Sequence, residues 1–467
     1  MHNNINERIF IGRNKELSAL NDFYNSGRFE MVTIYGRRRV GKTELIKEFI
    51  KDKKAIYFLA TEGSHAENMV GLTNAIHNTM SAGNYTDFRI ALDAIYDIAK
   101  KEKIVFVIDE YPYLAKSYKP VSSLLQHAID QNFQQLDMMI ILCGSSMSFM
   151  ENEVDGYKSP LYGRRTGQQK LFPLDFETSK EFFPEFTKQE QAVLYGITGG
   201  IPKYLLEVRQ NQSLEENIKK MFFRPQGLLF EEPANLLKQE LREPATYNTI
   251  ISAIATGRSK LNEIVTKINT ESFDSAKCNK YIKALIDLHI IKKELSILDK
   301  PTSKKSIYRL NDGMFRFWYR FVYPNVSQIT LDYGDLVYDY ISSQISEFMG
   351  EAFEDICKQY LWRENITGRL PFQFKDCGRW WGNNPFMKSE QEIDLLAYDN
   401  TEKKAIFCEC KWTNEQVDSR VLDSLVDKAE MFDFEDKYYM LFSKSGFKPD
   451  VKKRASDRII LVDFDDM

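Results

Sequence analysis

The stretch IYGRRRVGKTEL, residues 34–45, decides how the first part of this chain folds. Within it, Gly36–Thr43 satisfies the pattern GxxxxGK followed by Ser or Thr at every fixed position. The apolar run Phe29–Gly36 precedes the loop and predicts a buried strand, and Thr43–Asp52 follows it with the apolar spacing of a helix. Strand, glycine-rich loop and helix in this order form the context that a phosphate-binding loop requires. The sequence therefore predicts a P-loop.

The positions of this loop have distinct chemical tasks. Gly36 and Gly41 let the backbone curl so that successive amides point at phosphate oxygens, and the helix start adds partial positive charge. Lys42 is predicted to neutralise the β- and γ-phosphates of ATP, and Thr43 to place its hydroxyl on Mg²⁺. The other predicted nucleotide-contacting residues are Arg37, Arg38, Arg39, Val40 and Glu44. The three arginines could equally face solvent or a partner.

A second apolar run, Ile104–Glu110, ends in two carboxylates. In open parallel sheets, ligands bind at the carboxyl ends of the strands. We therefore expect Asp109 to hold the Mg²⁺ shell and Glu110 to orient or deprotonate the attacking water. The alternative is a strand that simply ends in an acidic turn.

Further polar residues flank the next two predicted strands. Met138–Ser146 ends in a serine pair, from which Ser145 is predicted to touch the γ-phosphate or the lytic water. Arg164 and Arg165 precede the last strand, predicted at Lys170–Leu174. An arginine can stabilise charge that develops on the γ-phosphoryl group, in the same chain or from a neighbouring subunit. A solvated arginine pair is the equal alternative.

Composition sets outer bounds on the class of protein. The chain has 467 residues, of which 43% are hydrophobic, so it is long enough for about three globular domains. Its 63 basic and 67 acidic residues give a net charge of 63 − 67 = −4, which excludes a uniformly basic chain but allows a local basic groove. No secretory segment and no apolar run of about 18 residues is present, so we expect no membrane span. Six cysteines without a CxxC pair predict a reducing, cytoplasmic location.

The chain is predicted to be an α/β protein with several parts. A parallel P-loop sheet is followed by a helical lid, by three helices and a hairpin in the winged-helix order, and by a second α/β unit. The lysines of the predicted wing, Lys300, Lys304 and Lys305, could follow a phosphate backbone, or the unit could serve as a spacer. The predicted ranges are 1–175, 176–240, 241–312 and 313–467.

A second group of polar residues lies in the last part. Asp394 lies on one predicted strand, and Glu409 and Lys411 share a face of the next, because side chains repeat every second residue. Two carboxylates and a lysine can hold a divalent ion against a phosphodiester. This pattern resembles the PD-(D/E)xK nuclease core, in which Glu354 on the preceding helix matches a further acidic metal ligand. The alternatives are a cross-strand ion pair, or a degenerate nuclease fold that binds DNA without cutting it.

Several motifs together resemble the archaeal-type ATPase family of AAA-like P-loop proteins. They are FIGRNKEL (10–17), IYGRRRVGKTEL (34–45), FVIDEYPYL (106–114), ILCGSSMSFM (141–150), SPLYGRRTGQ (159–168) and TGGIPKYL (198–205). The pieces FRFWYRFVYPN, GEAFEDI, GRWW, EIDLLA and ECKW resemble a C-terminal domain of unknown function attached to such ATPases. The resemblance implies that Ile11 and Gly12 border the adenine and that Pro202 of the lid lies near the nucleotide.

These observations predict a Mg²⁺-dependent ATPase that acts as a switch or motor. Its C-terminal nuclease-like domain would handle DNA. The alternative is a regulatory ATPase whose C-terminal domain recruits protein partners or a second copy without cutting DNA. The sequence leaves this choice open.

Overall fold

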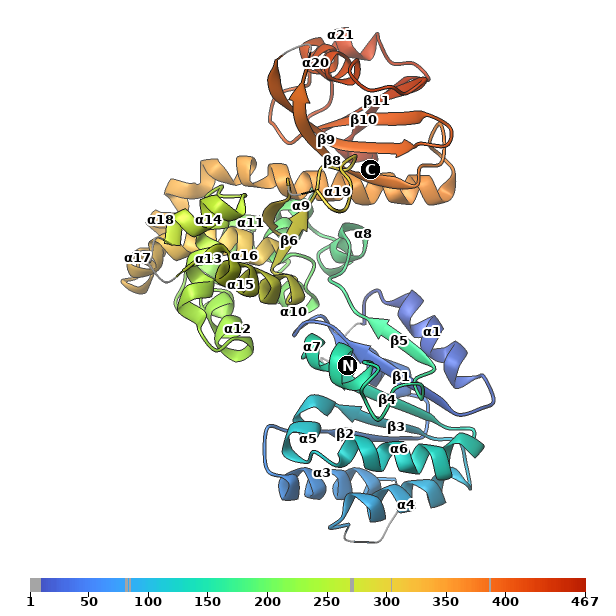
Figure 1. The fold of residues 1–467 in the computed structure, drawn as a ribbon. Coiled ribbons are helices and arrows are strands. Elements are labelled where there is room, and N and C mark those ends of the chain that lie inside the picture. Colours follow the sequence, from blue (N-terminus) through green and yellow to red (C-terminus); the bar gives the residue numbers. More distant parts are fainter. Residues whose placement is uncertain (1–9, 80–82, 84, 269–272, 304, 386–387) are drawn as a thin grey trace, which may run out of the picture. The chain divides into compact units, whose positions relative to one another are not determined.

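The computed structural model describes residues 10–79, 83, 85–268, 273–303, 305–385 and 388–467. The described chain divides into two compact units. The first unit runs to Leu174 and also includes Ile201–Lys203, and the second comprises Asp175–Gly200 and Tyr204–Met467. Each unit has its own sheet (Figure 1).

A five-stranded parallel sheet forms the centre of the first unit. Its strands lie in the order β2-β3-β4-β1-β5, so the chain crosses over between neighbouring strands as in a doubly wound fold. The edge strand β5 starts earlier than the predicted Lys170–Leu174, because it needs only one partner and tolerates the polar sequence GQQK. The strands are β1 Glu30–Tyr35, β2 Ala55–Leu59, β3 Val105–Asp109, β4 Met139–Gly144 and β5 Gly167–Lys170.

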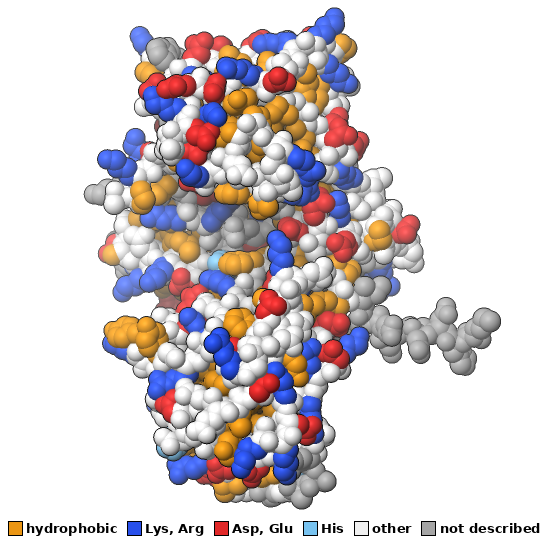
Figure 2. All heavy atoms as spheres, turned by 90° about the vertical axis from the view of Figure 1, so that its right-hand side faces the viewer, with side chains coloured by type: hydrophobic (Ala, Val, Ile, Leu, Met, Phe, Trp, Pro, Cys, Tyr) orange, Lys and Arg blue, Asp and Glu red, His pale blue; other side chains and the backbone are white. Residues whose placement is uncertain are grey.

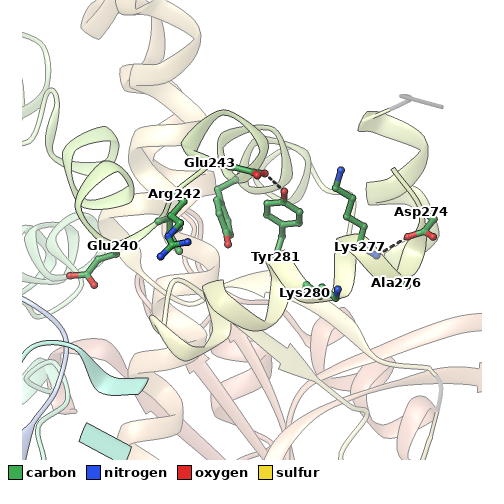
Figure 3. Close-up of a pocket in the computed structure, with 10 residues that line it drawn as sticks. Glu240, Arg242, Glu243, Asp274, Ala276, Lys277, Lys280 and Tyr281 are labelled. Atoms are coloured by element: carbon green, nitrogen blue, oxygen red, sulfur yellow. Dashed lines mark hydrogen bonds between the residues drawn. The ribbon is translucent and has the colours of Figure 1, made fainter. Parts of the chain in front are cut away.

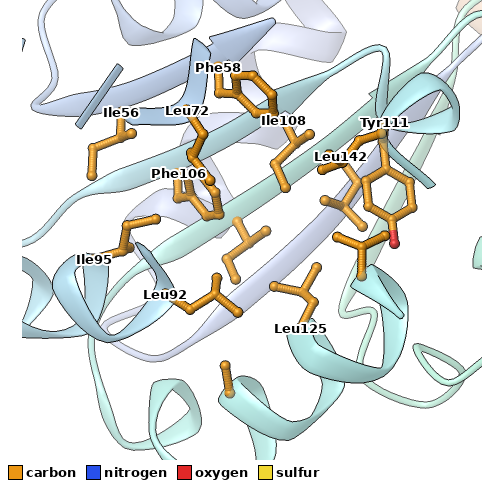
Figure 4. Packing of buried hydrophobic residues seen from close by; sticks show 14 of the residues in the cluster. Ile56, Phe58, Leu72, Leu92, Ile95, Phe106, Ile108, Tyr111, Leu125 and Leu142 are labelled. Carbon is orange, nitrogen blue, oxygen red and sulfur yellow. The ribbon is translucent and has the colours of Figure 1, made fainter. Parts of the chain in front are cut away.

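Helices cover both faces of this sheet. On one face, apolar side chains of β2, β3 and β4 pack against α3, α4, α5 and α6 in a cluster that includes Phe58, Phe106 and Leu125 (Figure 4). Burial of such side chains is the main stabilising contribution to the unit, roughly 1.5–3 kcal/mol each. The helices are α1 Asn14–Tyr24, α2 Lys42–Ile50, α3 His65–His77, α4 Phe88–Ala99, α5 Tyr111–Ser117, α6 Val121–Gln131 and α7 Met147–Phe149.

The second unit begins with helices and then contains three helices followed by a two-stranded sheet, in the predicted order. The first helices are α8 Phe176–Ser179, α9 Lys188–Thr198, α10 Pro202–Leu205, α11 Leu214–Phe222 and α12 Glu232–Glu240, of which α10 starts in residues that group with the first unit. The elements of the predicted winged-helix part are α13 Pro244–Ala255, α14 Leu261–Ile268, α15 Ser275–Asp287, β6 Ile291–Glu294 and β7 Ile307–Leu310.

The last part of the chain builds a mixed sheet in the order β12-β11-β10-β9-β8. Strands β10, β11 and β12 pair in parallel, and β9 pairs antiparallel with both β8 and β10. Strand β8 was absent from the prediction, because the polar and glycine-containing DCGRWWGNN lacks a clear apolar alternation. The elements are α16 Gly313–Phe317, α17 Val326–Thr330, α18 Gly334–Ile341, α19 Ile345–Thr367, β8 Asp376–Asn384, β9 Ser389–Asp399, β10 Lys404–Lys411, α20 Ser419–Ala429, β11 Asp436–Ser443, α21 Pro449–Lys452 and β12 Ile459–Asp463.

The two faces of this mixed sheet are covered by different helices. Phe407 of β10 packs with Leu422 and Leu425 of α20 in one apolar cluster. Cys410 faces the other way, where it meets Cys357 of α19. Because residues alternate along a strand, Glu409 and Lys411 lie on the α20 side.

The segment between β6 and the predicted wing contacts the edge of this sheet. The Ile297 amide donates to the Arg379 carbonyl at 2.9 Å, and the Trp381 amide donates to the Ser296 hydroxyl at 3.2 Å. The segment after β6 therefore extends the sheet beyond its edge strand β8, which protects that edge. Lys304, one of the three predicted wing lysines, lies outside the described residues.

None of the helices in the described ranges combines the length and the apolar character that crossing a membrane requires.

The aromatic run around α16 is buried, and the indole of Trp318 donates to the Phe230 carbonyl at 2.7 Å. On the face drawn in Figure 2, basic and acidic side chains are interspersed.

Candidate nucleotide-binding site

The loop between β1 and α2 depends on two glycines. Gly41 has a φ of 91°, which lies in the left-handed region that side chains disfavour. A Cβ atom at Gly36 would lie 2.4 Å from the Leu171 carbonyl oxygen, so the close approach of two backbone segments requires glycine there. The loop thus has the curled backbone that the sequence predicts.

Lys42 is buried inside this loop. Its ammonium group donates to the carbonyl oxygens of Gly36 at 3.0 Å and Arg37 at 3.1 Å. Among the described residues, no carboxylate forms an ion pair with it. An ammonium group that contacts only carbonyl dipoles has no carboxylate partner that an anionic ligand would need to displace.

Thr43 and Asp109 meet as the sequence predicts. The Thr43 hydroxyl donates to a carboxylate oxygen of Asp109 at 2.7 Å, and the Tyr57 hydroxyl donates to the same oxygen at 2.7 Å. Burial and the neighbouring Asp109 raise the pKa of Tyr57, so this phenol stays a hydrogen-bond donor. Tyr57 was missed in the sequence because its strand carries no motif.

Glu110 and Ser145 also lie together, at the ends of the neighbouring strands β3 and β4. Both the amide and the hydroxyl of Ser145 donate to one carboxylate oxygen of Glu110, at 3.1 and 2.9 Å. Glu110 itself has a φ of 52°, a strained value for a residue with a side chain. The backbone strain and the two hydrogen bonds together fix where this carboxylate lies.

An arginine outside the loop holds it in place. Arg13 donates to the carbonyl oxygens of Val40 at 3.1 Å and Phe172 at 2.5 Å, and it pairs with Glu16 at 2.9 Å. Arg13 directly follows Ile11 and Gly12, so these predicted adenine neighbours start a segment that is tied to the loop. The sequence pattern FIGRNKEL contained Arg13, but its partner Phe172 is 159 positions away and no local pattern reveals it.

The structure places the other predicted loop neighbours as follows. Pro202 lies beside Gly41, since a Cβ atom at Gly41 would lie 3.8 Å from the Pro202 ring. Arg38 donates to the Tyr113 hydroxyl at 2.9 Å, and Arg37 is buried.

Arg164 and Arg165 are not brought to the P-loop of the same chain. Both precede β5, where the Thr166 amide donates to the Met31 carbonyl, so they lie at the amino end of the sheet. Arg164 pairs with Asp130 at 2.8 Å, and Arg165 pairs with Asp155 at 2.8 Å. The P-loop follows the carboxyl end of β1, at the opposite edge.

The predicted C-terminal group is brought together in part. The pairing of β9 with β10 makes Asp394 and Glu409 neighbours, and the Cys410 amide donates to Asp394 at 2.8 Å. Burial and the charge of Glu409 raise the pKa of Asp394 to about 6. The Glu409 carboxylate, however, accepts from Lys411 at 2.6 Å and from Lys428 of α20 at 3.4 Å. Two ammonium groups therefore already compensate this carboxylate.

Glu354 lies apart from Glu409. It lies on α19, on the opposite side of the sheet from Glu409, 3.7 Å from both Arg309 and Arg379. Burial raises the pKa of Glu354 to about 8, although the Arg309 charge acts against this, and the charge of Asp394 contributes to the raised pKa of Glu354. In the described part of the chain, no three or more His, Cys, Asp or Glu side chains are arranged to hold a metal ion. The set of Glu354, Asp394 and Glu409 is therefore not assembled as the sequence interpretation required.

Comparisons with known proteins agree with the first site. Residues 10–208 match an ATPase domain predominantly from archaea, and residues 318–422 match a domain of archaeal and bacterial proteins of unknown function. The solved Walker-type ATPase PABY2304 of Pyrococcus abyssi has a TM-score of 0.54 and 19% identity, over 68% of this chain and 99% of its own. At this identity the similarity concerns the fold, which is that of a P-loop ATPase.

Two curated relatives come from Methanocaldococcus jannaschii. The uncharacterized ATP-binding protein MJ0423 is 46% identical over 46 residues, which cover 10% of this chain and 78% of that protein. The uncharacterized protein MJECL04 is 33% identical over 464 residues, which cover 98% of this chain and all of that protein. The chain therefore belongs to the family of MJECL04, and it joins an archaeal-type ATPase domain to the C-terminal domain of unknown function.

Proposed function

We propose that the protein is a Mg²⁺-dependent ATP hydrolase whose nucleotide state acts as a switch. The observation that carries this proposal is the convergence of Lys42, Thr43, Asp109, Glu110 and Ser145 at one edge of the parallel sheet. A buried cation, a hydroxyl, a carboxylate pair and a second hydroxyl form the donor set for a triphosphate and its metal.

The residues fit a magnesium ion. Thr43 and Asp109 supply two hard oxygen ligands from one place, held 2.7 Å apart by their hydrogen bond. When bound, Mg²⁺ would neutralise charge on the β- and γ-phosphate oxygens. Lys42 would exchange its carbonyl partners for phosphate oxygens, which compensate its charge far better.

Glu110 is the residue that we assign to the attacking water. Its carboxylate oxygen would accept the proton of the water in the transition state. Ser145 would orient this carboxylate through its two hydrogen bonds and thus act as a positioning residue.

The segment Ile201–Lys203 supports a switch. It groups with the first unit, where Pro202 lies beside Gly41, yet both of its neighbours in sequence belong to the second unit. On its amino side Gly199 and Gly200 both adopt left-handed φ values, which permit a change of direction. A rearrangement of the loop around phosphate would therefore act on both flanking helices through the backbone.

ATP turnover of the purified chain tests this proposal. We expect Mg²⁺-dependent release of phosphate that Lys42→Ala abolishes, whereas Lys47→Ala, an exposed lysine of the same helix, retains it. Equal turnover by wild type and Lys42→Ala would show that the hydrolysis does not come from this site.

DNA is a second candidate ligand, and one observation favours it. Residues 241–312 carry 13 Lys or Arg and 8 Asp or Glu, a net charge of +5, although the whole chain is at −4. Lys277, Lys280 and Lys283 are exposed on α15, and the first two line an open pocket of about 730 Å³ with Arg242 (Figure 3). Tyr247 and Tyr281 lie in the same pocket with ring centroids 4.8 Å apart. Cations beside aromatic rings suit a phosphate backbone and its bases, although Glu240, Glu243 and Asp274 also line this pocket.

A duplex-binding titration tests this second candidate. Lys277→Ala with Lys280→Ala should weaken binding and lower the slope of log affinity against log salt by about two. Lys437→Ala, a lysine of β11, is the matched control. An unchanged affinity of the double variant for the duplex would show that α15 does not bind DNA.

A further inference from the structure

A stretch of the chain is strongly acidic and belongs to neither site above. Residues 321–357 contain no Lys, Arg or His, whereas the whole chain has 63 basic residues. The acidic residues of this stretch are Asp332, Asp335, Asp339, Glu347, Glu351, Glu354 and Asp355. The first three follow α17 or lie on α18.

Helix α18 and the residues just before it present large apolar side chains to solvent. Leu331 is 69% exposed, Leu336 is 65% exposed and Tyr340 is 77% exposed, and Tyr333 is also exposed. Positions 333, 336 and 340 recur at helical spacing and share one face of α18. The opposite face is buried through Val337 and Ile341, so α18 is already packed on its inner side. We call Leu331, Tyr333, Leu336 and Tyr340 the α18 face.

Negative charge surrounds this face after all described ion pairs are counted. Arg224 pairs with Asp335 at 2.7 Å and lies 3.7 Å from Asp332. Lys219 pairs with Glu215 at 2.7 Å and with Asp339 at 3.3 Å, and it lies 3.8 Å from Asp335. Four carboxylates thus face two cations, a balance of 2 − 4 = −2.

The exposure of these acids shows where the charge remains available. The Asp332 side chain is 84% exposed, and Asp339 is also largely exposed. Ion pairs at such exposed positions are weak and exchange readily with solvent. Both carboxylates can therefore serve a partner that brings its own cations.

We propose that the α18 face docks a basic amphipathic segment of a partner protein. Its apolar side chains would cover Leu336 and Tyr340, where each buried aliphatic side chain contributes roughly 1.5–3 kcal/mol. Its Lys or Arg side chains would meet Asp332 and Asp339, which set orientation and speed association. Nucleic acid and anionic lipid carry the same charge sign as this face and are disfavoured. The surface lies in the domain of unknown function and contains none of the residues of the proposed nucleotide site.

The probe is a synthetic helical peptide of leucine and lysine, about 14 residues or roughly four turns long. A matched peptide carries Glu in place of Lys. Titrated against the full chain, the lysine peptide should bind and the glutamate peptide should not. Leu336→Ser with Tyr340→Ser should weaken binding at least about tenfold, as expected for a lost apolar anchor.

Two further variants separate the contributions. Asp332→Asn with Asp339→Asn should weaken binding mainly at low salt, because screening already removes this attraction at high salt. Ile366→Ser, which changes a residue of α19 that is 76% exposed, should bind like wild type. ATP turnover should stay unchanged in every variant, which keeps this test distinct from that of the proposed ATPase, and an unchanged unfolding transition shows that each variant is folded.

Four results would overturn the proposal. Both peptides could bind equally, or the α18 variants could bind like wild type. Sedimentation could instead show a dimer of the free chain that Tyr340→Ser dissociates, and the occupant would then be a second copy. Loss of duplex DNA binding in the α18 variants would likewise assign the face to a different class of ligand.

Discussion

The P-loop site and the C-terminal acid–lysine group contain the same residue types and differ in how these are paired. At the P-loop, Lys42 contacts carbonyl oxygens, and Asp109 accepts from hydroxyls. In the C-terminal group, Glu409 is bound by the ammonium groups of Lys411 and Lys428. A site that keeps its charges uncompensated by one another can bind a charged ligand, whereas a site that pairs them leaves less charge for one.

The largest expected effect compares the two lysines. Lys42→Ala should lower ATP turnover at least about 100-fold, because the transition state loses its buried cation. Lys411→Ala should leave turnover within about twofold of wild type, since its partner is Glu409 rather than a nucleotide. Steady-state phosphate release measures both. A large loss in Lys411→Ala would mean that the two regions are not functionally separate.

The next effect concerns Glu110. Glu110→Gln keeps the shape and hydrogen bonds of the side chain but cannot accept a proton. Turnover should fall roughly 100-fold while ATP affinity changes little, which is the result expected for loss of a general base. Ser145→Ala should give a smaller loss, because it only removes one of the two hydrogen bonds that orient Glu110. If Glu110→Gln hydrolysed ATP as fast as the wild type, the assignment of Glu110 as the general base would be wrong.

The third effect tests the C-terminal group as a stabilising element. Glu409→Gln leaves two lysines without their carboxylate and should cost about 1–3 kcal/mol of unfolding free energy. Glu402→Gln, which breaks the exposed pair with Lys404, should cost at most about 0.5 kcal/mol. Chemical denaturation measures both variants. A negligible cost for Glu409→Gln would indicate that the cluster serves a ligand rather than the fold.

The smallest effect is a pH dependence of stability. The pKa of Glu354 is raised from an ordinary 4.5 to about 8, so the folded state favours its protonated form. Stability from this group is complete below the ordinary pKa and is lost as pH rises through the folded value. Wild type should therefore lose a few degrees more than Glu354→Gln in Tm between about pH 5 and about pH 9. Glu347→Gln, an exposed acid of the same helix, is the control, and identical pH profiles in all three proteins would refute the shift.

The sequence predicted the P-loop well because its chemistry is contiguous. Gly36 to Thr43 lie within one turn-and-helix segment, and Asp109 and Ser145 follow strands whose parallel order fixes their common edge. The same rule applied to Arg164 and Arg165 would have placed them at the opposite edge, because they precede a parallel strand instead of following one.

Other features could not be read from local pattern. Arg13 bonds to Phe172 across 159 positions. Lys428 reaches Glu409 only because α20 packs on that face of the sheet. The spacing of Asp394, Glu409 and Lys411 fits a metal site and an ion pair equally, and only the position of a third element decides between them.

The most direct test of this account is calorimetric titration of Mg²⁺–ATP into the wild type, Lys42→Ala and a Glu409→Gln, Lys411→Met variant. The account predicts one binding site per chain in the wild type and in the C-terminal variant, and none in Lys42→Ala. Titration of Mg²⁺ without ATP should give the same heat in the wild type and in the C-terminal variant. Unchanged binding of Mg²⁺–ATP in Lys42→Ala would contradict the account. So would a Mg²⁺ site that is lost when Glu409 is substituted, because the account assigns the ligand to the P-loop and not to the C-terminal acid–lysine group.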